Sequence, residues 1–468
     1  MMTWPTLAWV LVLAGPSPQA VPGETALDRY VRAADPTYAW SVVRETKGDG
    51  STQFIIDLKS QTWRTEKEVD RPVWQHWVNV VKPDKPASST AFLFIGGGAN
   101  GGQPPKSADG LTSRMAAATN TVCVELKMIP NQPIVFDGDG KPRKEDDLIA
   151  YTWDKFLKTG DETWPARLPM VKSVVRAMDC VQEFLAGEQG GKFKVEKFVL
   201  GGASKRGWTT WCTAAVDKRV EAAIPVVIDV LNVGESMKHH VQAYGFYSLA
   251  VNDYFQHKIM QRVEDPRLPQ LYAIEDPYSY RERLTMPKYI VNASGDQFFL
   301  PDSSQFYFDG LKGEKHLRYV PNADHSLRDS DAMEGVTAFY QAVLAGKSRP
   351  QYSWTFEKDG SIRVKTGTAP KAVTLWQATN PKARDFRLAA IGKAYAARPL
   401  EDQGGGVHVG TIEAPKEGWT AFFVELAYDL GGAFPLKVTT AVRVLPDTLP
   451  HKDLDPAKAP LETRSPKK

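Results

Sequence analysis

The chain has 468 residues, which is too long for one ordinary hydrophobic core and predicts two or three domains. Hydrophobic residues make up 42% of it and charged residues 24%, as in a globular protein with a packed interior. The formal net charge of +3 is small for this size and no basic stripe is concentrated anywhere, so composition argues against a nucleic acid partner.

Residues 4–15 form an apolar run that is too short to span a bilayer. Small residues follow as far as Ala20, as before a cleavage site, although no Lys or Arg precedes the run. The pattern predicts a signal peptide over residues 1–20 and a secreted or periplasmic protein; an apolar tail on a cytosolic protein is the alternative. No later stretch is apolar enough to predict a transmembrane segment in the mature chain.

Metal and disulfide chemistry have little support in the sequence. The three cysteines, Cys123, Cys180 and Cys212, fit buried positions in predicted strands and helices, and their odd count argues against a disulfide framework, although one disulfide after export stays open. There is no HExxH motif and no paired Cys or clustered His, so neither a metal nor another cofactor is expected. The acidic run at 145–147 is interpreted as part of a solvated loop.

The first part of the chain predicts antiparallel strands at 38–43, 53–58 and 73–81. A continuous apolar run at 91–95 then predicts a strand buried on both faces. It leads into a glycine-rich loop at 96–102, whose backbone N–H groups can face a cavity without obstruction by side chains. A flexible connection and a phosphate-binding loop are the alternatives, the latter without the usual Gly-Lys-Ser/Thr ending.

Strands and helices alternate from about residue 111, which favours a mostly parallel sheet with helices on both faces. Residues 231–285 are rich in Tyr, Phe, His and Met and predict a helical cap over the sheet edge where ligands bind. The remaining predicted elements are strands at 121–126, 198–201, 223–230, 288–293 and 316–320, and helices at 111–118, 169–186, 303–311 and 331–345.

The strand at 198–201 ends in Gly-Gly-Ala-Ser204-Lys-Arg-Gly, a pattern typical of a nucleophile elbow. In that turn the Ser hydroxyl is exposed, and the N–H of Lys205, with one from Gly97 or Gly98, would bind an oxyanion. The match to G-x-S-x-G is imperfect, because Arg206 occupies the usual glycine position. A strand-to-helix turn with an ordinary capping Ser is the alternative.

A serine nucleophile needs a base, and the base needs an acid to orient it. In the chain order of α/β-hydrolases the acid follows the serine and the histidine comes last. Asp296 and His325 follow two predicted strands and lie at the same end of the parallel sheet, so they are the predicted acid and base. Asp229, near the end of the strand at 223–230, is a rival for the acid.

Three further side chains are predicted to contact the substrate. His239 and His240 lie in the predicted cap, and Arg206 adjoins the elbow. Two interpretations of Arg206 stay open. Its side chain binds an anionic substrate, or it fills the oxyanion space and leaves Ser204 inert.

After the predicted α/β-hydrolase domain at 25–348, the pattern changes to short alternating strands separated by turns. Residues 351–446 predict a β-sandwich. The tail at 447–468 is rich in Pro and Lys and is predicted to be disordered.

Several longer strings make the chain similar to the PhoPQ-activated pathogenicity-related protein family. They lie at 94–98, 151–155, 168–179, 201–208, 227–232 and 292–296. The resemblance implies an exported α/β-hydrolase-like protein with a C-terminal β domain, and a slime-mould member of the family implies peptidase-like activity. The elbow also resembles that of glucuronoyl esterases, in which a basic residue follows the serine.

The sequence therefore predicts a serine hydrolase that cleaves an ester or amide in a peptide or small molecule. A glucuronoyl-type carbohydrate esterase and a non-catalytic binding or signalling protein on a hydrolase scaffold are the alternatives.

Overall fold

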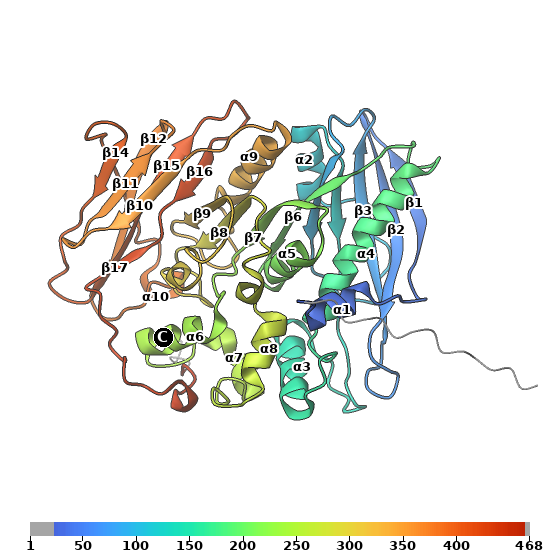
Figure 1. The fold of residues 1–468 in the computed structure, drawn as a ribbon, viewed down its shortest axis with the longest axis horizontal. Helices are drawn as coiled ribbons and strands as arrows, with labels where there is room; N and C mark the ends of the chain where they lie inside the picture. The colour runs from blue at the N-terminus through green and yellow to red at the C-terminus, as the bar shows by residue number, and fades with distance from the viewer. Residues whose placement is uncertain (1–22, 464–468) are drawn as a thin grey trace, which may run out of the picture.

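A computed structural model describes residues 23–463; the predicted signal peptide lies outside this range. A mixed 14-stranded sheet runs through the molecule (Figure 1). Its first strands pair antiparallel, and parallel pairing begins between β5 and β4 and continues to β9. In spatial order these strands are β1 (Ala39–Lys47), β2 (Ser51–Thr62), β3 (Val73–Pro83), β5 (Cys123–Leu126), β4 (Thr90–Ile95), β6 (Lys197–Ala203), β7 (Val220–Val226), β8 (Lys288–Ala293) and β9 (Lys315–Val320).

Helices cover both faces of this sheet. On one face pack α1 (Ala26–Arg32), α4 (Arg167–Ala186) and α5 (Lys205–Val216), and on the other α2 (Gly110–Thr119) and α9 (Ala332–Leu344). Residues 91–95 of β4 are all apolar because both faces of the strand are buried. Leu93 belongs to the hydrophobic core on one face of the sheet, and Phe92 belongs to the core on the other. The predicted α/β-hydrolase fold is confirmed.

The predicted cap is present as helices between β7 and β8. It contains α6 (Val233–Tyr244), α7 (Asn252–Gln256), α8 (Leu268–Glu275) and the 3-10 turns η1 (Leu249–Val251) and η2 (Pro277–Tyr280). Two predicted elements were too long. The strand predicted at 223–230 ends at Val226 in β7, and the helix predicted at 303–311 is only the 3-10 turn η3 (Ser303–Phe306). Within residues 23–463, none of the helices has the length and apolarity that crossing a membrane requires.

The interpretation of residues 145–147 as a solvated loop was wrong. They form the first turn of α3 (Glu145–Thr159), which packs against the cap. Three acidic residues in a first turn suit the positive end of the helix dipole, and buried Leu148, Ile149 and Phe156 anchor the helix. The stretch before the helix is rich in Pro, Asp and Gly, and this composition hid the start of the helix from pattern analysis.

The predicted β-sandwich is also present, but it is not a separate body. One layer is a three-stranded sheet of β10 (Tyr352–Phe356), β11 (Ile362–Thr366) and β14 (Val407–Gly410). This part of the chain also contains the short helix α10 (Leu388–Ile391). The other layer continues the main sheet beside β9 (Figure 1), because Thr439 pairs with Leu317 of β9. It consists of β16 (Leu436–Thr439), β15 (Trp419–Tyr428), β12 (Ala372–Asn380), β13 (Ala396–Pro399) and β17 (Arg443–Leu445).

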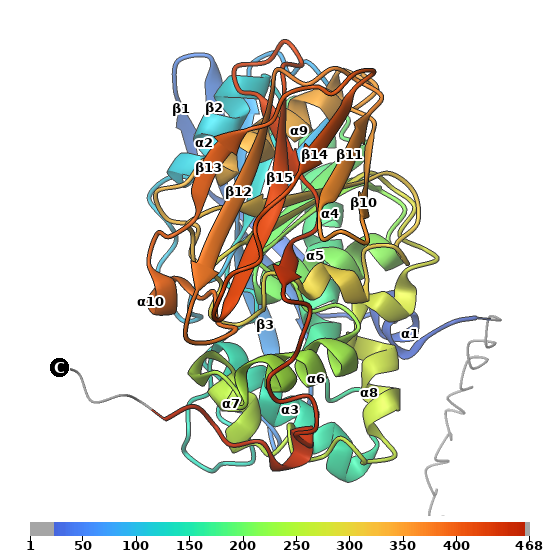
Figure 2. The same cartoon turned by 90° about the vertical axis from the view of Figure 1, so that its left-hand side faces the viewer.

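Residues 447–463, part of the predicted disordered tail, form an ordered segment that we call the C-terminal strap. Figure 2 shows it running from the C-terminal strands to the cap helices. It contains the 3-10 turn η4 (Pro456–Lys458), which five further described residues follow. Tyr247 of the cap donates its N–H to Pro460 at 2.8 Å and accepts the Glu462 N–H at 2.8 Å. The Pro and Lys composition concealed Leu454 and Leu461, which pack against the hydrophobic cluster of the cap.

Candidate active site

Ser204 occupies a strained turn between β6 and α5. Its backbone has φ 59° and ψ −128°, a conformation that costs free energy in a residue other than glycine. Its N–H donates to the Val226 carbonyl at 2.8 Å. A Cβ at Gly202 would lie 2.7 Å from the Arg206 carbonyl, and one at Gly207 would lie 2.8 Å from that of Gly202. The strand and helix therefore approach as closely as in a nucleophile elbow, although the second glycine comes one position late.

His325 and Asp296 form a hydrogen-bonded pair beyond the ends of β9 and β8. The His325 Nδ1 lies 2.8 Å from Asp296 Oδ2, and the other carboxylate oxygen accepts the Phe298 N–H at 2.7 Å. Asp296 is 3% exposed, so the carboxylate is held in a fixed orientation. Because Nδ1 carries the proton in this pair, Nε2 of His325 is the nitrogen that can accept another.

Ser204, the third member of the predicted triad, makes no hydrogen bond to His325. In the described part of the chain, neither the Ser204 hydroxyl nor the His325 Nε2 has a hydrogen-bond partner. Phe298 and Phe299 connect the two regions, since their rings lie 4.4 and 6.0 Å from the His325 ring and both line the cavity that Ser204 lines. In unliganded hydrolases the contact between the catalytic serine and histidine is often long and shortens when substrate binds, so this separation does not exclude the predicted pair.

The rival acid Asp229 has other partners. Its carboxylate accepts hydrogen bonds from Tyr307 at 2.7 Å and Tyr319 at 2.6 Å, and it makes no hydrogen bond to His325. Burial raises the pKa of Asp229 to about 8, against the two tyrosine hydroxyls, which lower it. A carboxyl that is largely protonated at neutral pH is poorly suited to stabilising an imidazolium ion.

We expect Asp229→Asn to become relatively more stable than the wild type as the pH rises. The pKa of Asp229 in the folded protein, about 8, lies above its ordinary value of 3.8. The stability that this carboxyl contributes is therefore complete below pH 3.8 and is lost as the pH rises through about 8. Between these limits the difference in unfolding free energy changes by up to about 1.4 kcal/mol per pH unit. Thermal unfolding of both proteins at pH 5 and pH 8 measures it; a difference independent of pH would contradict the assignment.

The predicted oxyanion donors have free N–H groups. The N–H groups of Gly97, Gly98 and Lys205 donate no hydrogen bond to any residue between 23 and 463. The glycine loop is nevertheless anchored, because the Gly97 carbonyl accepts the Met128 N–H at 2.9 Å. A fixed loop with unused N–H groups is what stabilisation of a developing oxyanion requires.

Arg206 is not among the residues that line the cavity, and its role in substrate binding stays a prediction. Its guanidinium forms two hydrogen bonds to Glu145, at 2.7 and 2.6 Å, and a third to the Ile129 carbonyl. Lys205 Nζ also contacts Glu145, at 2.9 Å. Burial would raise the pKa of Glu145, but Arg206 and Lys205 lower it to about 2. Arg206 is thus held beside the glycine loop, where a Cβ at Gly97 would lie 2.8 Å from its Nη2.

Gly97→Ala is expected to lower kcat on the order of 100-fold, as the loss of one oxyanion donor does. The added methyl group would collide with a guanidinium that Glu145 holds in place, so the loop must shift. Gly102→Ala is the control, because a Cβ there meets only the Ala99 carbonyl at 4.0 Å. Ester hydrolysis by both variants, with their melting temperatures, provides the measurement. Equal kcat in the two folded variants would argue against a role for this loop.

His239 and His240 do not line the cavity either, and both are buried. His239 Nε2 lies 3.0 Å from Asp302, which also accepts a hydrogen bond from Arg384 at 2.6 Å. Burial would raise the pKa of Asp302, but Arg384 and His239 hold it well below its usual range. His240 accepts the Ser248 N–H at 3.0 Å, and burial lowers its pKa to about 3. These contacts give the two histidines a structural role in the cap, and their predicted role in substrate binding stays a prediction.

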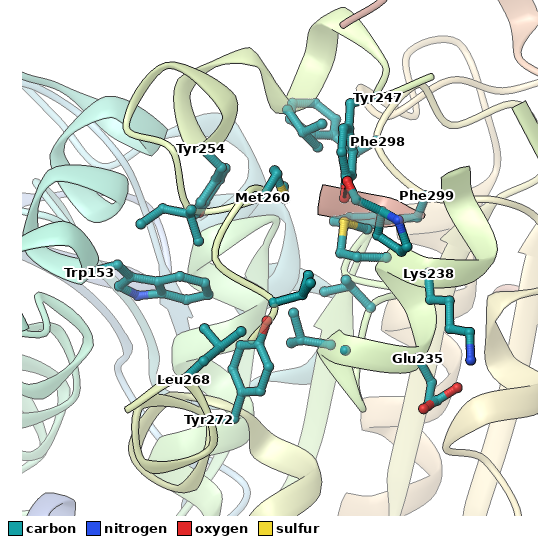
Figure 3. A pocket seen from close by; sticks show the side chains of 18 of the residues that line it. Trp153, Glu235, Lys238, Tyr247, Tyr254, Met260, Leu268, Tyr272, Phe298 and Phe299 are labelled. Carbon is teal, nitrogen blue, oxygen red and sulfur yellow. Dashed lines mark hydrogen bonds between the residues drawn. The ribbon is translucent and has the colours of Figure 1, made fainter. Parts of the chain in front are cut away.

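A cavity of about 470 Å³ lies between the cap and the sheet edge (Figure 3). Ser204 is one of the residues that line it. Its lining includes residues that sequence analysis missed: Trp153 on α3, and Asp455 and Pro456 of the C-terminal strap. Trp153 lies in the string at 151–155 that carries the family resemblance, so the sequence contained a signal for its importance. Among the described residues, no group of His, Cys, Asp and Glu side chains is arranged to hold a metal ion.

Several solved structures are similar to this chain at low sequence identity. Among solved structures, acetyl xylan esterase 1 from Thermoanaerobacterium has 13% identity and a TM-score of 0.47, covering 68% of this chain and 92% of its own. Acylaminoacyl peptidase from Pyrococcus horikoshii has 13% identity and a TM-score of 0.39, covering 66% of this chain and 57% of its own.

Sequence comparison gives a closer relation. Autocrine proliferation repressor protein A of Dictyostelium discoideum is 40% identical over 455 residues, which cover 91% of each chain. The model of the family described as PhoPQ-activated pathogenicity-related protein matches residues 27–387. The chain therefore belongs to the PhoPQ-activated pathogenicity-related protein family.

Proposed function

We propose that this protein is a serine hydrolase that cleaves an ester or amide bond by nucleophilic attack of Ser204. The observation that carries the proposal is the strained elbow at Ser204 beside free N–H groups, with a histidine–aspartate pair beyond neighbouring strand ends. The predicted signal peptide supports action outside the cytosol.

Each side chain has a role in the proposed reaction. Ser204 Oγ attacks the carbonyl carbon, and His325 Nε2 takes its proton and later gives it to the leaving group. Asp296 holds the imidazole and stabilises its charged form. The N–H groups of Lys205 and of Gly97 or Gly98 bind the oxyanion.

The second candidate is a binding or signalling protein that retains a hydrolase scaffold. It is favoured by the absence of a hydrogen bond between Ser204 and His325 in the described residues. The name of the 40% identical relative also denotes repression of proliferation, which defines no reaction.

Labelling with a fluorophosphonate probe tests the two candidates. The Ser204 oxygen displaces fluoride from phosphorus only if the hydroxyl is activated, so we expect the wild type to be labelled and Ser204→Ala and His325→Ala not to be. Ser353→Ala, an exposed serine on β10, is the control and should be labelled like the wild type. A folded wild type that remains unlabelled would favour the binding protein.

A further inference from the structure

The cavity beside Ser204 is built from aromatic rings that support one another. Figure 3 shows Trp153, Tyr254 and Tyr272 on one side and Phe298 and Phe299 on the other. The Trp153 ring packs edge-on against Tyr254 at 5.4 Å and Tyr272 at 6.3 Å between ring centroids. Rings locked by such contacts form a preformed wall that accepts an apolar group at little cost in conformational entropy.

Two of the three cations that line the cavity, Lys205 and Arg167, are paired within the protein. Lys205 is paired with Glu145 and Asp146, and Arg167 is paired with Glu275 at 3.2 Å. A further Arg167 hydrogen bond goes to the Lys205 carbonyl at 2.6 Å. The third lining cation, Lys238, makes no ion pair or side-chain hydrogen bond within residues 23–463, and it lies on the same side of the cavity as Glu235 (Figure 3). The paired cations beside Ser204 offer little to an anionic or a sugar group, which needs several free hydrogen-bonding partners.

The C-terminal strap holds one wall of the same cavity in place. Asp455 and Pro456 line it, and the Tyr247 hydroxyl, from another lining residue, donates to the Pro456 carbonyl at 3.1 Å. Asp455 is paired with Lys458 at 3.2 Å and accepts the Ala457 N–H at 2.9 Å. This wall of the cavity therefore consists of the Asp455 carboxylate, whose oxygens are bonded within the strap, and the ring of Pro456.

We infer that the cavity receives a bulky apolar group, alkyl or aryl, attached on one side of the bond that is cleaved; this rests on the proposed function. A volume of about 470 Å³ is in the range of sites for drug-sized ligands and far exceeds what an acetyl group fills. Each additional buried methylene should raise kcat/KM roughly fourfold until the cavity is full.

Two ester series test the inference: p-nitrophenyl esters with acyl chains from acetyl to decanoyl, and acetates of increasingly bulky alcohols. We expect kcat/KM to rise steeply with size in one series. Gly234→Leu should reduce that rise, because Gly234 lines the cavity and a Cβ there has only Tyr272 nearby, at 3.7 Å. Gly234→Ala is the matched control and should keep most of the rise. Hydrolysis that favours acetyl esters in both series would overturn the inference and leave the proposed function intact.

A binding measurement separates this inference from the catalytic proposal. In Ser204→Ala, calorimetric titration should show decanoate binding at least tenfold more tightly than butyrate, and adding Gly234→Leu should remove the difference. If no ester is hydrolysed but this difference is found, the proposed function fails and the apolar nature of the ligand group stands. Equal binding of the two acids, with no hydrolysis, would overturn both.

Discussion

Ser204→Ala is expected to lower kcat/KM for an activated ester on the order of 10⁶-fold, because no other group on the elbow replaces the attacking oxygen. His325→Ala should cost about as much, since the serine is a weak nucleophile without its base. The double variant should be no slower than either single variant, because the two side chains act in one step. Initial rates of the four purified proteins with a chromogenic ester provide the measurement.

This result depends on Ser204 and His325 meeting when substrate binds. Both have unpaired atoms in the described structure, and Phe298 packs against the His325 ring at 4.4 Å. The melting temperatures of the variants show whether a loss of rate reflects unfolding. A folded Ser204→Ala protein that keeps the wild-type rate would exclude Ser204 as the nucleophile.

Asp296→Asn is expected to lower kcat on the order of 10⁴-fold while leaving the fold intact. An asparagine amide facing Nδ1 of His325 would favour the opposite tautomer, so that Nε2 carries a proton and cannot accept another. The rates of the wild type and the variant with one ester, measured over a range of pH, test this.

Asp229→Asn is the matched control for this substitution. The side chain is of the same size, lies in the same region beyond the strands, and bonds to Tyr307 and Tyr319 instead of His325. Its kcat should stay within about tenfold of the wild type, since no step of the proposed reaction uses it. If Asp229→Asn lost activity while Asp296→Asn kept it, the acid would be Asp229.

The positions of Ser204, Asp296 and His325 could be predicted because each follows a strongly apolar strand. Parallel strands bring their carboxyl ends to one edge, so strand order alone places these side chains together. Their roles remain predictions that the variants above test. The fold was predictable for the same reason: alternation of strands and helices is a local signal.

What sequence analysis missed depends on contacts between distant residues. Arg206 was interpreted through its neighbours in the elbow, but its position is set by Glu145, 61 residues away. His239 is likewise fixed by Asp302, 63 residues away. The separate sandwich domain was predicted from a change in pattern, and no local signal reports that Thr439 pairs with Leu317. Such pairings follow from packing, which periodicity does not encode.

The C-terminal strap has a consequence for how the protein matures. It follows β17 in the chain, so a growing polypeptide contains Ser204, Asp296 and His325 long before it contains Asp455 and Pro456. Chains fold from the N-terminus as they are synthesised. A partly made molecule can therefore carry the whole proposed triad with an unfinished cavity, and the wall of the cavity is complete only when the strap docks on Tyr247.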